Sequence, residues 1–296
     1  MNKVEPFFSI VIPTYNRKDI INICIDSVLS QTFDNYEIII VDNGSTDGTK
    51  DFINTNYSDI RIKYNFQKGS GSPASPRNRG INLSKSKWIC FLDSDDFWHK
   101  DKLLTTYHEI IDNNKIDVIC HSEKVFYSKS KKFGKTMRYG PFCDDFYLQM
   151  LQYGNELSTS ATSVKRSFLH KFNLRFNESE SLFIVEDFDL WLRLARNGAN
   201  FKFVNRVLGY YVLNNDNFIS NKEIYIKSLN QLYISHKNYL KDNKLDEEII
   251  SKIIDVRLAL VTIRYLQGSS RLFQLANVVL RNPAISANII YNYLRK

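Results

Sequence analysis

Three carboxylates lie within four residues in Asp93-Ser94-Asp95-Asp96, directly after the apolar run 88–92. Carboxylates this close repel one another, and a hard divalent cation with oxygen ligands relieves the repulsion. In an extended backbone, Asp93 and Asp95 point to one side and Ser94 to the other. Such a pair can hold an ion that completes its coordination with a diphosphate and water. The alternative is an acidic turn in which Asp96 caps the next helix.

A second polar pair, Asp42-Asn43, follows the apolar run 36–41. A carboxylate and an amide at this position can accept hydrogen bonds from a nucleobase N–H or a ribose hydroxyl, or they can simply form an Asx turn. Tyr15 follows the first apolar run, where it can stack on a base or pack against its neighbours. These two segments are therefore candidate nucleoside contacts.

Two arginines, Arg77 and Arg79, lie at the start of an expected helix with Ser75 as its N-cap and Pro76 in its first turn. A helix N-terminus and a guanidinium group both favour a phosphate. Exposure of both arginines to solvent is the alternative.

A third acidic pair, Glu186-Asp187, begins an expected helix over 186–196. A carboxylate there can act as a general base that removes the proton from an attacking hydroxyl group. Acidic residues are also favoured electrostatically at any helix N-terminus. This segment alone does not separate the two interpretations.

The elements that must position these side chains alternate between strand and helix in the first half of the chain. The strands are predicted to be apolar on both faces, which indicates a mainly parallel sheet covered on both sides by helices. They are expected at 7–12, 36–41, 61–66 and 88–92. Ligands of such sheets bind at the carboxyl ends of the strands. This rule selects residues 14–17, 42–45, 69–79 and 93–96.

The second half of the chain is more mixed. From residue 221 onward the sequence predicts about four helical segments, with breaks near 241–244, 268–270 and 282–283. Before them, the expected strands are 118–122, 158–164, 201–204 and 208–213.

Composition places the 296-residue chain among folded proteins, with 43% hydrophobic and 24% charged residues. It contains no predicted leader and no apolar run of about 20 residues, so we expect a cytoplasmic protein. The four cysteines have no CxxC spacing and read as reduced core residues. Of the net charge of +8, residues 256–296 carry +6, and no basic stripe typical of a nucleic-acid binder is present.

The ordered set of motifs resembles the family 2 glycosyltransferases of the GT-A fold, which build bacterial capsules, O-antigens and related glycans. The resemblance covers roughly residues 7–215. It implies an α/β, Rossmann-like fold: a mixed, mainly parallel sheet flanked by helices, with a C-terminal helical extension. The expected domains are a catalytic domain at 1–220 and a basic helical region at 221–296.

The resemblance also implies roles for the polar clusters. Asp187 would be the catalytic base, with Glu186 as the alternative, and Asp95 with Asp96 would hold Mn²⁺ or Mg²⁺. The attacking hydroxyl would displace the diphosphate in one step and invert the anomeric configuration. Donor contacts are expected from Pro13, Thr14, Tyr15, Arg17, Asp42, Asn43, Arg77, Asp93 and Ser94. The family has an acid where Asn43 stands, and often a Tyr-Arg-x-His segment where Tyr211-Val212-Leu213-Asn214 stands.

The resemblance implies a nucleotide-sugar donor, expected to be UDP-linked, and a glycan acceptor, expected on polyprenyl diphosphate. The basic tail 256–296 either contacts the inner leaflet of the membrane or packs on the catalytic domain. The alternative function is a catalytically silent nucleotide-sugar-binding scaffold of a glycan assembly complex.

Overall fold

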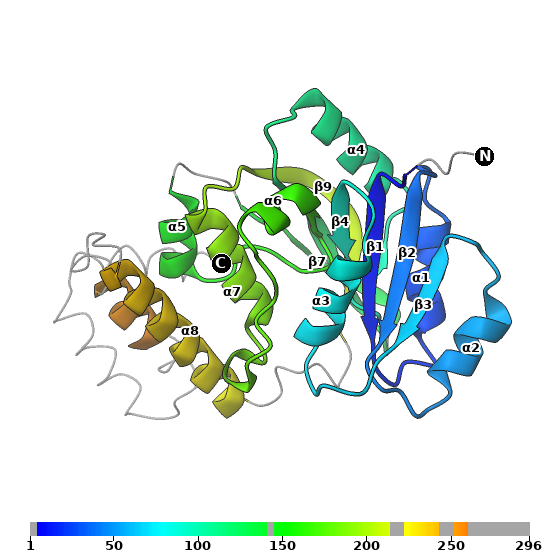
Figure 1. The fold of residues 1–296 in the computed structure, drawn as a ribbon, viewed down its shortest axis with the longest axis horizontal. Helices are drawn as coiled ribbons and strands as arrows, with labels where there is room; N and C mark the ends of the chain where they lie inside the picture. The colour runs from blue at the N-terminus through cyan, green and yellow to red at the C-terminus, as the bar shows by residue number, and fades with distance from the viewer. Residues whose placement is uncertain (1–4, 141–144, 214–221, 243–251, 260–296) are drawn as a thin grey trace. The chain divides into compact units, whose positions relative to one another are not determined.

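The computed structural model describes residues 5–140, 145–213, 222–242 and 252–259. The chain forms two compact units (Figure 1). The first unit comprises residues 1–142, 157–178 and 193–217, and the second comprises 143–156, 179–192 and 218–296. The second unit therefore includes two segments that precede residue 220. A functional domain boundary at residue 220 stays a prediction.

The first unit is built on one mixed sheet whose strand order is β3-β2-β1-β4-β8-β6-β9-β5, with β7 paired to β6. Its first four strands are parallel to one another and match the apolar runs in the sequence: β1 Phe8–Thr14, β2 Tyr36–Asp42, β3 Ile62–Phe66 and β4 Trp88–Phe91. Every residue of β1, β2 and β4 is buried, as expected for strands covered on both faces.

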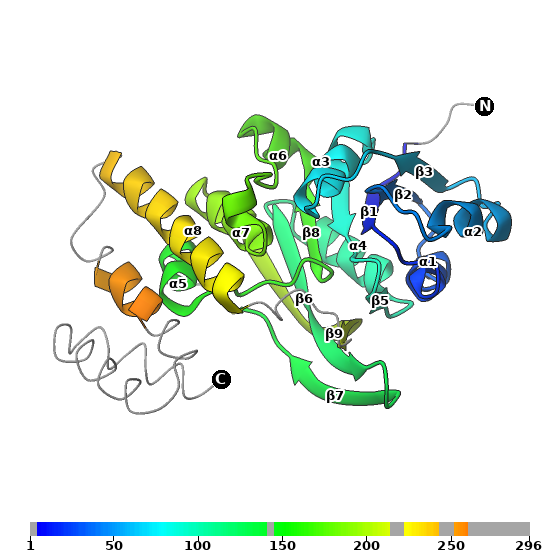
Figure 2. The same cartoon turned by 90° about the horizontal axis from the view of Figure 1, so that it is seen from below.

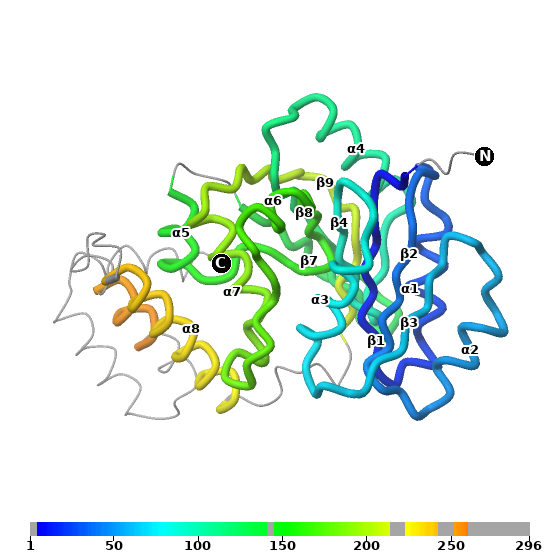
Figure 3. Tube along the Cα trace, in the orientation of Figure 1, coloured from blue at the N-terminus to red at the C-terminus, as the bar shows by residue number. Residues whose placement is uncertain are grey.

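Helices cover the two faces of these strands. The helices of this half are α1 Ile21–Leu29, α2 Thr49–Asn56, α3 Ala74–Leu83 and α4 Lys102–Asp112. Ile10 and Ile12 of β1 share a core cluster with Ile21 and Ile25 of α1. Val11, which alternates with them, faces Gly80 of α3. The tube trace shows α3 lying beside β1 (Figure 3).

The start of α3 differs from the prediction. Ser75 does not cap the helix, because α3 begins one residue earlier, at Ala74, after Pro73. Pro73 already has a helical backbone, with φ −72°. The Ser72 hydroxyl instead accepts a hydrogen bond from the Ala74 N–H. The expected N-cap was therefore wrong by two positions, since Pro73 precedes the first helical residue.

The remaining strands of this sheet are β5 Phe97–Trp98, β6 Val118–Tyr127, β7 Lys132–Met137, β8 Thr162–Lys165 and β9 Phe201–Leu213. The expected strands 201–204 and 208–213 are one strand, because irregular pairing with β6 near Ser122 accommodates the residues between them. β8 begins later than expected, and β6 extends beyond Ser122 to pair with β7 (Figure 2). The first unit also contains the short helix α6 Arg166–Lys171.

The second unit is helical in its described part. It contains α5 Phe146–Tyr153, the 3₁₀ turn η1 Glu180–Leu182, the start of α7 Glu186–Arg196, α8 Lys222–Asp242 and a helical segment at 252–259. A buried polar chain joins three of these helices. Tyr147 Oη lies 2.9 Å from His236 Nδ1, and His236 Nε2 lies 3.5 Å from Asp189 Oδ1.

Two composition-based expectations concern the whole chain. Cys24, Cys90 and Cys120 are free and buried, as expected for core cysteines, while Cys143 lies outside the described residues. Within the described ranges, no helix has the length and apolar character to cross a membrane.

Candidate donor and catalytic residues

The acidic loop 93–96 connects the carboxyl end of β4 to β5 and is linked to the start of α3. Arg77 Nη2 donates a hydrogen bond to Asp93 Oδ1 at 2.6 Å. The guanidinium of Arg77 also lies 5.2 Å from the ring centre of Phe176. Arg77 is buried, whereas the Asp93 side chain is 32% exposed. The structure thus brings together the predicted diphosphate ligand and the first acid of the loop, and Arg79 of the same helix is exposed.

Asp95 is the second acid of this loop that solvent reaches. Its side chain is 24% exposed, and its Oδ2 lies 3.8 Å from Arg17 Nη2. Burial raises the pKa of Asp95, the charge of Asp93 raises it further, and Arg17 opposes both effects. A bound cation would relieve the same repulsion. Arg17 therefore lies beside the acidic loop, and its role as a donor contact stays a prediction.

Asp96 is held differently from its neighbours. It is buried, its Oδ2 accepts a hydrogen bond from Ser160 Oγ at 2.6 Å, and its Oδ1 accepts one from the Val212 N–H at 2.8 Å. Burial raises the pKa of Asp96 well above its usual value, and the charges of Asp95 and Glu123 add to the rise. Asp96 therefore anchors the acidic loop to β9, and Ser94 beside it is also buried.

Two further residues lie near this loop: Glu123 was not singled out from the sequence, and Tyr211 was named only within the segment 211–214. Glu123 on β6 is fully buried, and its Oε2 accepts a hydrogen bond from Tyr139 Oη at 2.7 Å. Burial raises the pKa of Glu123 to about 7. The pKa of Tyr211 on β9 is raised by burial and then by the charges of Asp96 and Asp95. Since β6 and β9 meet the loop only in the folded sheet, no local spacing indicates these contacts.

Asp42 closes the turn after β2. It is fully buried, its Oδ1 accepts a hydrogen bond from the Ser45 N–H at 2.7 Å, and its Oδ2 accepts one from Tyr64 Oη at 2.6 Å. The turn alternative considered for this residue is therefore present in the structure. A ligand contact by Asp42 would be additional to these bonds, since each carboxylate oxygen can accept more than one donor.

Asn43 organises the loop that precedes α3. Its Oδ1 accepts hydrogen bonds from Gln67 Nε2 at 2.8 Å and from both the N–H and the hydroxyl of Ser70 at 3.1 Å, and its Nδ2 donates to the Ser72 carbonyl at 3.2 Å. An Asp at this position would lose the bond to Ser72. The amide therefore fits this chain's own loop.

The segment after β1 lies beside the turn after β2. Thr14 is paired with Asp42 in the sheet, and its buried hydroxyl has no hydrogen-bond partner in the described part of the chain. Asn16 has a positive φ of 50° and exchanges hydrogen bonds with the neighbouring 45–46 turn. Pro13 is buried in β1, whereas Tyr15 is 56% exposed, so Tyr15 is accessible for stacking on a base.

The carboxylate oxygens of the acidic loop fit a cation that is held by few protein ligands. The described residues contain no group of three or more His, Cys, Asp or Glu side chains arranged to hold a metal ion. Asp93 and Asp95, the partly exposed acids, are the pair best able to supply oxygen ligands, while both oxygens of Asp96 already accept protein hydrogen bonds. An ion there would need further ligands from a diphosphate and water.

Glu186 and Asp187 lie in the second unit, at the N-terminus of α7, as predicted. Glu186 is 5% exposed, and Asp187 is half-buried. Asp187 Oδ1 accepts a hydrogen bond from the Phe188 N–H at 2.6 Å, and its Oδ2 accepts one from Asn155 Nδ2 at 3.3 Å. These bonds orient the carboxylate of Asp187.

Most of the basic tail lies outside the described residues, as does Asn214. Of the six basic residues expected there, Arg257 is described. Its guanidinium group lies close to Gly154, because a Cβ added to that glycine would be 2.5 Å from Arg257 Nη2. Arg257 also lowers the pKa of Tyr233 against the larger effect of burial. Arg257 therefore packs within the second unit.

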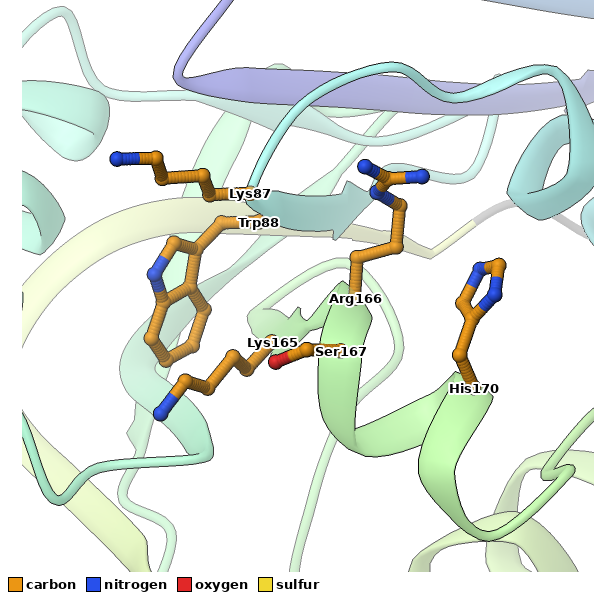
Figure 4. Close-up of a pocket in the computed structure, with 6 residues that line it drawn as sticks. All are labelled: Lys87, Trp88, Lys165, Arg166, Ser167 and His170. Carbon is orange, nitrogen blue, oxygen red and sulfur yellow. The ribbon is translucent and has the colours of Figure 1, made fainter.

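A basic pocket lies at the other end of β4 from the acidic loop. It has a volume of about 350 Å³ and is lined by Lys87, Trp88, Lys165, Arg166, Ser167 and His170 (Figure 4). Arg166 Nε donates to the Ser86 carbonyl at 2.6 Å, and Lys165 lies 3.4 Å from Asp117. The lining includes none of the acidic-loop residues.

A mixed, largely parallel sheet with an acidic loop, a paired arginine and an exposed tyrosine at its strand ends is the arrangement of the GT-A fold. Residues 9–171 match the glycosyl transferase family 2 pattern. The chain belongs to this family and is a glycosyltransferase.

Curated relatives support this assignment, and a solved structure has the same fold. The chain is 34% identical to the Escherichia coli UDP-Glc:alpha-D-GlcNAc-diphosphoundecaprenol beta-1,3-glucosyltransferase WfaP over 72% of this chain and 80% of that protein. It is 28% identical to the Bacillus subtilis putative teichuronic acid biosynthesis glycosyltransferase TuaG over 75% of this chain and 85% of that protein. The structure of S. aureus TarS 1-349 in complex with UDP-GlcNAc is similar, with a TM-score of 0.66 and 19% sequence identity. The match covers 97% of this chain and 80% of the TarS chain.

Proposed function

We propose that this glycosyltransferase moves a sugar from a UDP-linked donor to a hydroxyl group of a glycan carried on polyprenyl diphosphate, in the synthesis of a bacterial surface polysaccharide. The name of the E. coli relative specifies a UDP-sugar and a diphosphoundecaprenol acceptor, and that of the B. subtilis relative specifies teichuronic acid. The observation that carries the proposal is the Arg77–Asp93 pair at the carboxyl end of β4. It combines a guanidinium group for phosphate with a carboxylate for a cation.

The donor is held by the strand ends of the first unit. Tyr15 stacks on the uracil ring, because its side chain is exposed at the end of β1. Thr14 supplies its buried hydroxyl, and Asp42 and Asn43 accept from the base or ribose while they keep the loop closed. Arg77 turns its guanidinium group from Asp93 to the diphosphate.

The proposed cation is Mn²⁺ or Mg²⁺, held by Asp95 with Asp93. Such an ion would neutralise the negative charge that develops on the departing diphosphate. Asp96 fixes the loop through Ser160 and the backbone of Val212, so that the exposed acids stay in place.

Asp187 is the proposed base, and Glu186 is the alternative. Asp187 takes the proton from the acceptor hydroxyl, whose oxygen bonds to the anomeric carbon as the bond from that carbon to UDP breaks. A single displacement inverts the anomeric configuration. The hydrogen bonds from Asn155 and the Phe188 N–H hold the Asp187 carboxylate in one orientation for this step.

The location is also part of the proposal. We place the enzyme at the cytoplasmic face of the inner membrane, where a polyprenyl-linked acceptor is accessible. The tail 256–296, with its net charge of +6, is the membrane contact suggested by the sequence.

A transfer assay tests this function. The full chain is incubated with a panel of UDP-, GDP- and TDP-sugars, Mn²⁺ and a short-chain GlcNAc-diphospholipid, and nucleotide release and product linkage are measured. We expect one UDP-sugar to be consumed, an inverted linkage by NMR, and a loss of at least 100-fold in Asp187→Asn. Glu186→Gln is the matched comparison, and a larger loss there would make Glu186 the base. Retention of the donor's anomeric configuration would contradict the proposed mechanism.

A further inference from the structure

The β6–β7 hairpin is strongly basic, which the net charge of the whole chain does not reveal. Residues 124–138 contain six basic residues and no acid, as many as the tail 256–296, so the rest of the chain has a net charge of −4. The six are Lys124, Lys129, Lys131, Lys132, Lys135 and Arg138. All but Lys124 are exposed. No ion pair joins any of them to a carboxylate in the described ranges.

Aromatic side chains accompany this charge. Phe133 of β7 is 52% exposed and Tyr127 of β6 is 43% exposed. Phe133 contacts Phe126 with 5.2 Å between ring centres and Tyr210 with 5.3 Å, and Lys124 Nζ lies 5.4 Å from the Phe133 ring centre. These rings fix Phe133 at the rim of the sheet, so its exposed edge is held in place.

The hairpin is a free edge of the first unit. Within the part of the chain that the structure describes, β7 pairs with β6 alone, and the turn 128–131 joins the two strands (Figure 2). Leu213 of β9 is paired with Tyr127 of β6, and it adds a third exposed apolar side chain beside this turn. Lysines on an edge strand also discourage edge-to-edge pairing. That role accounts for Lys132 and Lys135, but it explains neither the turn lysines nor the exposed rings.

We propose that the β6–β7 hairpin is a membrane-docking surface that binds the headgroups of anionic phospholipids. Lysine and arginine near such a surface are attracted by its negative potential, and phenylalanine and tyrosine partition into the headgroup region. Both classes of side chain occur here on one protruding element. The proposal complements the tail contact and is independent of sugar transfer.

The position of the hairpin suits its proposed role. Phe126 of β6 is paired with Val212 of β9, and the Val212 N–H donates a hydrogen bond to Asp96 Oδ1 at 2.8 Å. Docking by the hairpin therefore places the end of the sheet that carries the acidic loop near the lipid surface. A substrate attached to a lipid would be presented to that end.

A vesicle flotation assay with the full chain tests the proposal. Vesicles of phosphatidylcholine with 30% phosphatidylglycerol are compared with pure phosphatidylcholine, without donor or acceptor. Replacement of Lys129, Lys131, Lys132 and Lys135 by Gln should weaken binding to the anionic vesicles at least tenfold. The matched control replaces the exposed Lys50, Lys85, Lys100 and Lys115 by Gln and should bind as wild type does.

A second pair of variants tests the aromatic contribution. Phe133→Ser should reduce binding at high salt, where the charge contribution is screened. Phe66→Ser is the matched control, because Phe66 is also 52% exposed on an outer strand of the same sheet. Circular dichroism and unfolding midpoints establish that each variant is folded.

Three results would overturn the proposal. The fourfold hairpin variant could bind as wild type does, or binding could be lost only when Arg264, Arg271 and Arg281 of the tail are replaced by Gln. Alternatively, the wild-type chain could bind a soluble polyanion such as polyphosphate and not the vesicles, which would assign the hairpin to an anionic polymer. Because the vesicles contain no substrate, failure of the transfer assay leaves this test unaffected.

Discussion

The guanidinium group of Arg77 donates a hydrogen bond to the Asp93 carboxylate, with 2.6 Å between Nη2 and Oδ1. This bond joins the first turn of α3 to the loop after β4. Arg77 is buried while Asp93 is about one-third exposed, so a ligand reaches the pair from the side of Asp93. In the free protein the two charges neutralise each other, and donor binding must exchange this pair for contacts to phosphate.

Loss of the Arg77 guanidinium should therefore weaken donor binding. We expect Arg77→Ala to lower UDP affinity at least tenfold, because a buried charged hydrogen bond to phosphate is lost and Asp93 is left to repel the ligand. Titration calorimetry with UDP and Mn²⁺ measures this effect. Arg79→Ala is the control on the same helix and should change affinity less than twofold. An equal effect of both variants would show that general positive charge, and not Arg77, holds the donor.

Asp96 should contribute to stability through its shape and hydrogen bonds more than through its charge. In Asp96→Asn, the amide oxygen can still accept from the Val212 N–H and the NH₂ can donate to Ser160 Oγ, so stability at pH 7.5 should equal or exceed that of wild type. Asp96→Ala leaves both partners unsatisfied and should be about 1–3 kcal/mol less stable than the Asn variant. Urea unfolding measures both. Equal stability of the Asn and Ala variants would contradict this role.

Glu123 should make stability depend on pH. Its folded pKa of about 7 lies above the usual value of 4.5, so the folded state retains a proton that the unfolded state has lost between these values. The contribution of Glu123 is therefore complete below pH 4.5 and is lost as the pH rises to 7, by about 3 kcal/mol at most. In Glu123→Gln this loss should disappear.

The measurement is the difference in free energy of unfolding between wild type and Glu123→Gln from pH 4.5 to 8. Taking the difference removes the opposing effect of His121, whose pKa is lowered to about 3 by burial and by Lys102. A difference that does not change with pH would show that Glu123 is ionised in the folded protein throughout this range.

Gly80 should be required by packing rather than by backbone conformation. A Cβ at this position would lie 2.2 Å from Val11 Cγ1, so α3 would have to move away from β1. We expect Gly80→Ala to destabilise the protein by about 1–3 kcal/mol, despite the better helix propensity of alanine. Val11→Ala and the double variant complete a double-mutant cycle. The losses in free energy of unfolding of the two single variants should sum to more than the loss in the double variant. Additive costs would contradict a direct clash.

The fold of the first half could be predicted because its signals are local. The strands ending at Thr14 and Asp42 are continuous apolar runs, and the turn residues that follow them are polar. The second half was harder to predict, since β9 spans 13 residues across a disrupted register that only its pairing with β6 reveals. A strand that continues through a bulge looks like two strands in sequence.

The sequence by itself determined the ordered apolar strands, the acidic loop 93–96 at the end of one of them, and the acidic start of α7, because each is written in neighbouring residues. Tertiary structure decided what each polar side chain contacts. Ser160 and Val212 hold Asp96 across 64 and 116 residues of chain, and Arg77 meets Asp93 across 16. Such partners meet only when strands distant in sequence pair in one sheet, so hydrogen bonding, burial and the resulting pKa values arise only in the folded chain.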